Sequence, residues 1–397
     1  MLTDFINLVK DFSYLRVKPL FHSFPQAHSI LLISLLFLLS CQTPEQPRPL
    51  SRDIRPTESF EGRVGAPFID THNHLFGGSR RDENYLGAGK TALSAMGNLG
   101  IRKMFLMAPP FSPDHPMVFD VEELLPVPRG SPDRFAILGG GGSLNTMIHH
   151  AHKEGVVSTE LKERFRKRAV EILSKGAIGF GEFAVDHFSF APDHPYESVP
   201  ADHPLLLALA DVAGERAAPI DIHMEAIPKD MPLPNRTVLT RSGRNPSMLR
   251  ANLSAFERLL GHNRRAPVIW AHAGWCNTGY RTADLCRELL SRNPNLYMSI
   301  KLSPESVQET RPITPDQKSI RPEWLELFRE FPDRFVIGTD QFYGPPGARQ
   351  IGPQKTEAMR VFMDLLPQDM ARQIGIDNPI RLFHLETPTT KSTKETK

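Results

Sequence analysis

Residues 67–74 read Pro-Phe-Ile-Asp-Thr-His-Asn-His, a short apolar run that ends in two histidines. Successive side chains of a β-strand point to opposite faces, so His72 and His74 would share one face, one pleat repeat apart. Two imidazoles on one face at a strand end can serve as a pair of metal ligands. A single His-x-His occurs by chance in many soluble chains, so its meaning depends on whether other strands end in matching residues.

The composition is that of a folded globular protein with one large domain. The chain has 397 residues, of which 40% are hydrophobic and 23% are charged, close to globular averages. The net charge is only +2, and no block of like charge is long enough for a nucleic-acid arm. We therefore expect no nucleic-acid partner.

The first 64 residues are expected to lie outside this domain. An uncharged apolar run at 30–39 is too short to span a bilayer as a helix, and the Leu38-Leu39-Ser40-Cys41 that overlaps its end resembles the lipobox of bacterial lipoproteins. This resemblance implies a signal peptide over residues 1–41 and a lipid anchor at Cys41 that holds the exported protein at the bacterial cell envelope. A plain signal peptide with an incidental cysteine is the alternative. Residues 42–64 read as a flexible tether, and residues 386–397 as a disordered polar tail.

Between these ends, short apolar runs alternate with amphipathic stretches. The runs are continuously apolar, as expected for parallel strands covered on both faces, and there are eight of them: residues 67–72, 103–108, 135–139, 177–183, 220–223, 268–272, 296–300 and 335–339. Eight strands with intervening helices predict an α/β fold of the (β/α)8 barrel type over residues 65–385. An open doubly wound sheet is the alternative, but no Gly-x-Gly-x-x-Gly follows the first strand.

Three of the connecting helices have clear boundaries in the sequence. Residues 159–174 carry one apolar stripe, and residues 204–213 follow Asp202 as a predicted N-cap with Pro204 in the first turn. A third helix is predicted over residues 247–260, with Ser247 as N-cap and a stop at Gly261.

Two cysteines lie within the predicted domain, Cys276 and Cys286. Their spacing across a loop and a helix start does not specify a disulfide, and we expect free or buried thiols.

Polar residues with metal-binding side chains follow five of the eight strands. Because the active site of a barrel lies at the C-terminal ends of its strands, these side chains would converge on one mouth. Four histidines and two carboxylates suffice for one or two divalent ions with a position left for water, and they are His72, His74, Glu182, His223, His272 and Asp340. Asp70 shares the strand face of His72 but lies deeper, so we expect it to support a ligand rather than to be one.

These strand ends resemble the amidohydrolase superfamily of metal-dependent hydrolases. The Phe68–His74 stretch, the strand-end His223 and His272, Asp340 and the closing segment 376–383 all carry the resemblance, which spans roughly residues 65 to 385. Gly181-Glu182 is similar to the TatD-like branch, which implies a bridging carboxylate and two metal ions. Mononuclear members use the first two histidines, the strand-five histidine and the strand-eight aspartate, and this arrangement stays open.

The resemblance also implies a chemistry. A divalent metal, Zn²⁺ before Mn²⁺, would activate water to cleave an amide, ester, lactone or phosphoester bond in a small-molecule substrate. Asp340 would orient that water and carry its proton, and His272, if it is not a ligand, would polarise the substrate, so both are the predicted catalytic residues. Decarboxylation, known in the amidohydrolase-related branch, and a catalytically retired barrel acting as a surface binding lipoprotein are the alternatives.

Substrate contacts are expected from residues just beyond the strand ends. The candidates are Lys301, Trp275, Arg281 and His187, with Lys301 as an anchor for an anionic group. A separate cluster, His149-His150-Ala151-His152, is expected in a helix or an exposed loop and not at a metal.

Overall fold

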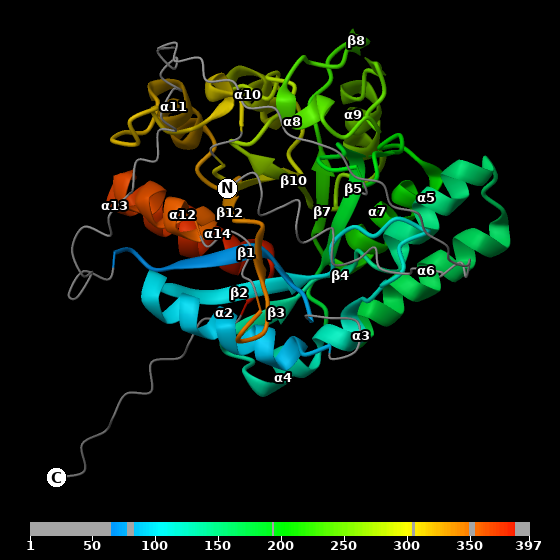
Figure 1. The fold of residues 1–397 in the computed structure, drawn as a ribbon, viewed down its shortest axis with the longest axis horizontal. Helices are drawn as coiled ribbons and strands as arrows, with labels where there is room; N and C mark the ends of the chain where they lie inside the picture. The colour runs from blue at the N-terminus through cyan, green and yellow to red at the C-terminus, as the bar shows by residue number, and fades with distance from the viewer. Residues whose placement is uncertain (1–64, 78–82, 193, 304–305, 349–353, 386–397) are drawn as a thin grey trace, which may run out of the picture.

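A parallel β-barrel forms the centre of the computed structural model, which describes residues 65–77, 83–192, 194–303, 306–348 and 354–385 (Figure 1). Both faces of a strand in such a barrel are covered, and the continuous apolar runs of the sequence therefore suit these strands. The barrel strands follow one another around the ring in chain order: β1 (Phe68–Leu75), β2 (Ile101–Met107), β3 (Phe135–Ile137) with β4 (Gly139–Gly140), β5 (Phe180–His187), β7 (Ile220–Met224), β10 (Val268–Ala273), β11 (Leu296–Ile300) and β12 (Phe335–Ile337).

The ring of strands is closed. β1 pairs with β2 on one side and with β12 on the other, while β3 pairs with β2 and β4 pairs with β5. Only Leu138 separates β3 from β4, and its backbone N–H donates to the carbonyl of Leu106 at 2.9 Å. β3 and β4 therefore form one chain segment that joins the two halves of the sheet, and the predicted (β/α)8 barrel is confirmed.

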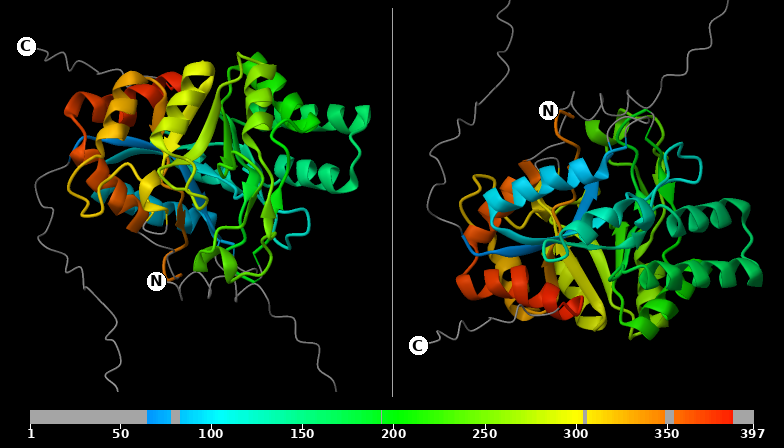
Figure 2. Two further views of the ribbon diagram at one scale, coloured as in Figure 1. Left: turned by 90° about the horizontal axis from the view of Figure 1, so that it is seen from above. Right: turned by 90° about the horizontal axis from the view of Figure 1, so that it is seen from below.

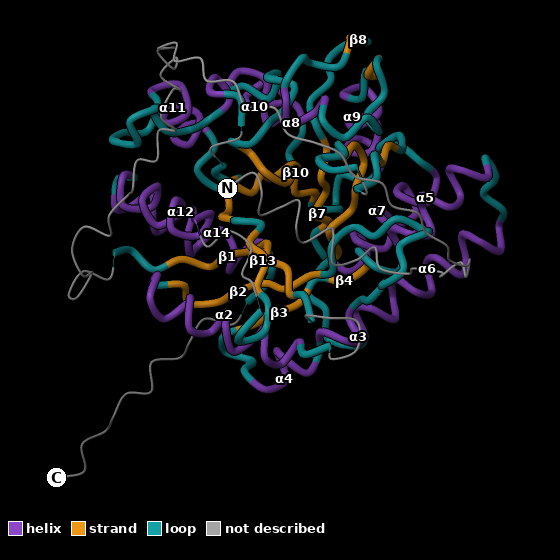
Figure 3. Tube along the Cα trace, viewed as in Figure 1, coloured by secondary structure: helices purple, strands orange, loops and turns teal. Residues whose placement is uncertain are grey.

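Helices surround the barrel in an outer layer, as the views from above and below in Figure 2 and the trace in Figure 3 show. The helices are α2 (Tyr85–Leu99), α3 (Val121–Leu124), α4 (Pro126–Gly130), α5 (Leu144–Glu154), α6 (Thr159–Ser174), α7 (Pro204–Arg216), α8 (Thr237–Thr240), α9 (Leu253–His262), α10 (Ala283–Arg292), α11 (Pro322–Glu330), α12 (Gln354–Leu365), α13 (Gln368–Arg372) and α14 (Asn378–Leu382), with a 3-10 turn at Gln308–Thr310 and a π-helical turn at Gln373–Asp377. Short strands add to the loops: β6 (Glu197–Ser198), the pair β8 (Met231–Pro232) and β9 (Met248–Leu249), and β13 (Gln341–Tyr343).

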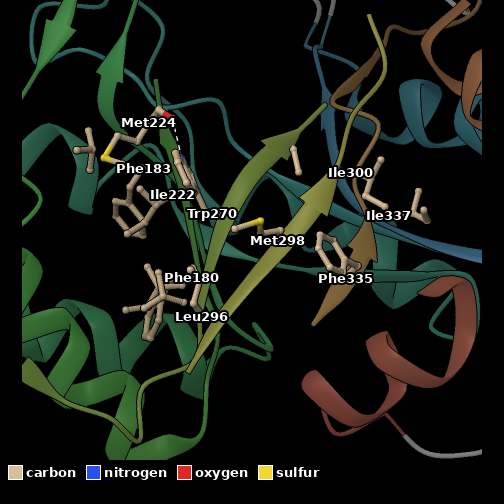
Figure 4. Close-up of a cluster of buried hydrophobic side chains, with 14 of the residues drawn as sticks. Phe180, Phe183, Ile222, Met224, Trp270, Leu296, Met298, Ile300, Phe335 and Ile337 are labelled. Atoms are coloured by element: carbon tan, nitrogen blue, oxygen red, sulfur yellow. Dashed lines mark hydrogen bonds between the residues drawn. The ribbon is translucent and has the colours of Figure 1, made fainter. Parts of the chain in front are cut away.

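Two hydrophobic layers hold the barrel together, because alternate residues of each strand face opposite sides. The outer layer lies between strands and helices and includes the side chains labelled in Figure 4, where the Trp270 indole N–H also donates to the Met224 carbonyl at 2.7 Å. The inner layer fills the barrel: Ile69, Phe105, Met107, Leu138, Ile269 and Val336, with Leu382 and Phe383 at the end of α14. The barrel interior is thus a packed apolar core.

Two predicted helix boundaries are wrong. The helix expected over residues 247–260 begins only at Leu253, because Met248 and Leu249 pair with β8 as a strand; Asn252, not Ser247, is its N-cap. The helix expected over 204–213 extends to Arg216, and its N-cap is His203, whose Nδ1 accepts from the Leu205 N–H. Sheet pairing and a histidine cap are contacts that helix-end rules do not anticipate. The helix over residues 159–174 is confirmed as α6.

The predicted signal peptide, lipidation site, tether and polar tail lie outside the described residues. Within the part that the structure describes, no helix is long and apolar enough to cross a membrane. Cys276 and Cys286 are both free and buried, as predicted.

Candidate metal centre

His72 and His74 form the first side of the site. The pleat of β1 places both side chains inside the barrel mouth, with their Nε2 atoms 3.2 Å apart. The Nδ1 atom of His74 faces the Met107 carbonyl at 3.1 Å, and the Nδ1 atom of His72 lies 3.2 Å from Oδ1 of Asp221. An acceptor at Nδ1 keeps the proton on that nitrogen, so the lone pair of each Nε2 is directed into the site.

Glu182 is the central carboxylate of the site. Its Oε2 lies 3.5 Å from Nε2 of His72 and 3.4 Å from Nε2 of His74. Its Oε1 faces the other side of the barrel, 2.8 Å from Nδ1 of His223 and 3.1 Å from Nε2 of His272. The carboxylate therefore connects the β1 histidines to the histidines of β7 and β10.

Asp340 closes the site from the end of β12. Its Oδ1 lies 3.2 Å from Nε2 of His74 and 3.9 Å from Nε2 of His72. Its Oδ2 is bound by the ammonium groups of Lys301 and Lys355, the latter at 3.2 Å; Lys355 also donates to the Asp340 carbonyl at 2.6 Å. One oxygen of Asp340 thus faces the histidines and the other is held by lysines.

The backbone around the site is shaped for this convergence. His272 and Asp340 have φ angles of 70° and 54°, in the left-handed region that side chains other than glycine rarely adopt. Gly338 precedes Asp340 by two residues, and a Cβ at that position would lie 3.0 Å from the Cβ of His72. Strained conformations of this kind gather at functional sites, where the surrounding structure holds them in place.

The donor set fits a divalent metal ion. Two ligand atoms bound to one ion at about 2.0–2.2 Å lie roughly 3.0–3.5 Å apart, which is close to the separations between the nitrogen and oxygen atoms described above. Two sets of three converge among the described residues, His72 with His74 and Asp340, and His72 with Glu182 and His272. Imidazole nitrogens and carboxylate oxygens are donors that suit Zn²⁺ and Mn²⁺. Lone pairs of buried nitrogens facing one another are costly without a cation between them.

The electrostatics of the site favour positive charge at this point. Burial lowers the pKa of His72, but the negative charges of Asp221 and Glu182 outweigh burial and hold that pKa well above its usual value. Burial raises the pKa of Glu182, yet the neighbouring histidines keep it well below the usual range. Burial also acts on Asp340, whose pKa is nevertheless held well below its usual value by Lys301 and Lys355. A field that retains a proton on His72 also attracts a metal cation.

The predicted ligands are therefore all brought together at one end of the barrel. One point is faced by the side chains of His72, His74, Glu182 and Asp340. Oε1 of Glu182 also contacts His223 and His272, which therefore lie next to that point. Asp70, predicted to support a ligand, accepts from the backbone N–H and hydroxyl of Thr339 at 3.0 and 2.6 Å, next to Asp340, and from the backbone N–H of His72 at 3.5 Å. The carboxylate beside His72 is Asp221.

The predicted substrate residues occupy different environments. The Trp275 ring lies 5.5 Å from the His223 ring and 5.7 Å from the His272 ring, and the His187 ring lies 4.4 Å from that of His223, so both line the site. Lys301 is at the site but is 4% exposed and paired with Asp340. Arg281 is directed away from the mouth: its guanidinium donates to the carbonyls of Trp270 and Ala271 and stacks on the Trp270 ring at 3.9 Å. These contacts give Arg281 a structural role and offer its substrate role no support.

Two site residues were missed by sequence reasoning. Asp221 is fully buried beside His72, and the alternation in Ile220-Asp221-Ile222-His223 already placed it on the same strand face as His223. Lys355 lies on α12, 15 residues after Asp340 in the chain, and no local pattern marks it. The separate histidine cluster lies in α5, as expected for a helix, and His149 contacts the Ala184 carbonyl at 2.8 Å.

The family assignment agrees with this geometry. The sequence profile of the Amidohydrolase family matches residues 69–385, so the chain belongs to the amidohydrolase family, whose members are metal-dependent enzymes. No curated protein matches the sequence.

Several solved structures are similar to this chain. One is dihydroorotase from Campylobacter jejuni, at 15% identity over 82% of this chain and 85% of that one, with a TM-score of 0.45. Another is 2,6-dihydroxybenzoate decarboxylase from Rhizobium, at 13% identity over 81% and 99% of the chains, with a TM-score of 0.43. Dihydroorotase from Saccharomyces cerevisiae, solved with 5-fluoroorotic acid, has 11% identity over 81% and 85%, with a TM-score of 0.46.

Proposed function

We propose that this protein is a metal-dependent hydrolase that cleaves an amide, ester, lactone or phosphoester bond in a small molecule. The observation that carries the proposal is the convergence of Nε2 of His72, Nε2 of His74, Oε2 of Glu182 and Oδ1 of Asp340 at separations of 3.2–3.9 Å. We propose Zn²⁺ as the ion, with Mn²⁺ as the alternative. When bound, a divalent ion lowers the pKa of water and polarises a substrate oxygen.

The residues of the chain then have separate roles. His72, His74, Glu182 and Asp340 would hold the ion, with the tautomers of both histidines set by their Nδ1 contacts. Oδ1 of Asp340 faces the ion position while Oδ2 is held by lysines, so Asp340 would orient the attacking water beside the ion. Nε2 of His272 contacts Oε1 of Glu182, so its imidazole would lie beside the substrate oxygen that has to be polarised. Trp275 and His187 would exclude water from the side of the site where His223 lies.

Metal analysis followed by a substrate screen tests this function. Protein purified without chelator is expected to contain zinc or manganese and to hydrolyse at least one member of a panel of amides, lactones and phosphoesters. His72→Ala is expected to lose both metal and activity, whereas His262→Ala, which removes an outer histidine paired with Asp211, should keep both. If the wild-type protein contains no metal and EDTA leaves its stability unchanged, the barrel is not an enzyme of this kind but a catalytically retired binding protein. Carbon dioxide release from a carboxylated substrate, without hydrolysis, would indicate a decarboxylase instead.

We also propose that the protein is exported and lipid-anchored through Cys41 at the bacterial cell envelope. The support is the sequence Leu38-Leu39-Ser40-Cys41 after an apolar run. Labelling of expressing cells with an alkyne fatty acid is expected to mark the wild-type protein in the membrane fraction. Cys41→Ser should lose the label, while Cys276→Ser, at a buried cysteine, should keep it. Equal labelling of wild type and Cys41→Ser would refute the anchor.

A further inference from the structure

Two lysines from different elements bind one oxygen of Asp340. Lys301 follows β11 and Lys355 lies in the first turn of α12, and both ammonium groups contact Oδ2. Each also lies over an aromatic ring, Lys301 3.9 Å from the centre of Trp275 and Lys355 5.7 Å from the centre of Phe342. Lys301 is only 4% exposed. A buried ammonium is costly unless it is paired, so this arrangement is built into the fold.

Lys301 places positive charge where a second ion would otherwise be attracted. Trp275, under the ammonium of Lys301, contacts the rings of both His223 and His272, which form the Oε1 side of Glu182. Both convergent donor sets among the described residues contain His72, and neither contains His223. Because the two sets share His72, we assign one ion to them; the Lys301 ammonium lies on the side of His223 and His272, where a second ion would have to bind.

The balance between two effects decides what the lysines do to metal binding. The lysines already hold the Asp340 side chain in place, so less side-chain entropy is lost when a metal ion binds, and this raises the metal affinity slightly. Repulsion between an ammonium and a divalent cation is a larger effect, because the energy doubles with the charge of the ion and weak screening preserves it in a buried site. The net effect of each lysine should therefore be to weaken the binding of a divalent ion.

We propose that Lys301 and Lys355 are built-in counter-cations of Asp340: they hold its Oδ2, leave Oδ1 for the metal, and oppose the entry of a second divalent ion. This inference rests on the metal centre proposed above. It assigns the two lysines to the metal and its stoichiometry and not to the binding of an anionic substrate. The centre would then hold one divalent ion.

Titration of chelator-treated protein with Zn²⁺ alone tests the proposal. Stoichiometry is measured by elemental analysis and affinity by competition with a chromogenic chelator. Wild type is expected to bind one equivalent. Lys355→Gln, a change at a partly exposed side chain, is expected to bind zinc at least about tenfold tighter or to take a second equivalent. Lys355→Arg, which keeps the charge, should stay within about threefold of wild type, as should Lys153→Gln at an exposed lysine.

Different failures have different meanings. Two equivalents in wild type, or unchanged or weaker zinc binding by folded Lys355→Gln, would overturn the counter-cation role and leave the proposed metal centre intact. No zinc binding by wild type would overturn both. Lys301→Gln is the second variant and should show the same direction if it folds, as judged by circular dichroism. If Lys301→Gln does not fold, the zinc binding of Lys355→Gln alone decides whether the proposal stands.

Discussion

At the scale of single residues, the contact between His72 and Asp221 controls how the first ligand is presented. Asp221 is fully buried and lies 3.2 Å from Nδ1 of His72, while Nε2 of the same ring faces Glu182 and His74. A carboxylate behind a ligating histidine fixes its tautomer and ring orientation and adds electron density to the other nitrogen. Asp221 would thus act on the metal through the His72 ring and would not bind the metal itself.

Asp221→Asn is expected to reduce zinc affinity by about 10–100-fold while the protein stays folded. The amide removes one negative charge next to the metal position and no longer fixes the proton on Nδ1 of His72. Chelator competition measures the affinity, and urea unfolding checks the fold. Asp316→Asn, at an exposed aspartate that binds Thr314, is the control and should bind zinc as wild type does. Equal affinities in the two variants would refute a role for Asp221.

At the scale of elements, α14 closes the end of the barrel opposite the metal centre. Phe383 follows this helix, is 3% exposed, and meets the ring of Phe105 edge-to-face with centroids 4.7 Å apart. Leu382 lies in the same inner hydrophobic layer. The C-terminal segment therefore contributes to the barrel interior and is not an appendage.

Phe383→Ala is expected to lower the free energy of unfolding by about 3 kcal/mol, because it leaves a cavity beside Phe105. Urea denaturation monitored by circular dichroism measures the loss. Val361→Ala, at a side chain on α12 that is 37% exposed, should change the free energy of unfolding by less than about 0.5 kcal/mol. A loss of similar size in both variants would contradict the closing role of Phe383.

The contact between α5 and β5 should make the stability of the protein depend on pH. His149 joins α5 to β5 through its contact with the Ala184 carbonyl, and burial lowers the pKa of His149 to about 4. The unfolded chain binds a proton at a histidine pKa of about 6.5, where the native state does not, so stability present above pH 6.5 is lost as pH falls toward 4. His149→Gln should flatten the decline of unfolding free energy between pH 6.5 and 4. His262→Gln, at an outer histidine, is the control, and equal slopes in wild type and His149→Gln would refute the assignment.

At the scale of the whole molecule, the proposed metal centre would tie different sides of the barrel together. Its side chains come from β1, β5, β7 and β10 and from Asp340 between β12 and β13, strands that lie on different sides of the ring (Figure 1). An ion held by the native state and not by the unfolded chain stabilises the entire barrel. Metal loading should therefore appear in global unfolding and not only at the site.

Removal of the metal with EDTA is expected to lower the melting temperature by roughly 5 °C, because an ion at a hundredfold excess over its dissociation constant adds about 2.7 kcal/mol. Differential scanning calorimetry before and after EDTA measures the shift, and added zinc should restore it. His72→Ala should be insensitive to both treatments, whereas His262→Ala should respond like wild type. A wild-type melting temperature indifferent to EDTA and zinc would contradict a resident metal.

The sequence by itself determined the barrel and the six strand-end side chains. Continuous apolar runs mark buried parallel strands, and strand ends in a barrel converge wherever the loops between them go. Tertiary structure alone decided the partners of those side chains: Asp221 behind His72, two lysines on Asp340, Arg281 bound to the barrel backbone, and a strand in place of the start of the predicted 247–260 helix. Such contacts join residues far apart in the chain, and their geometry depends on how strands and loops pack, which no local pattern encodes.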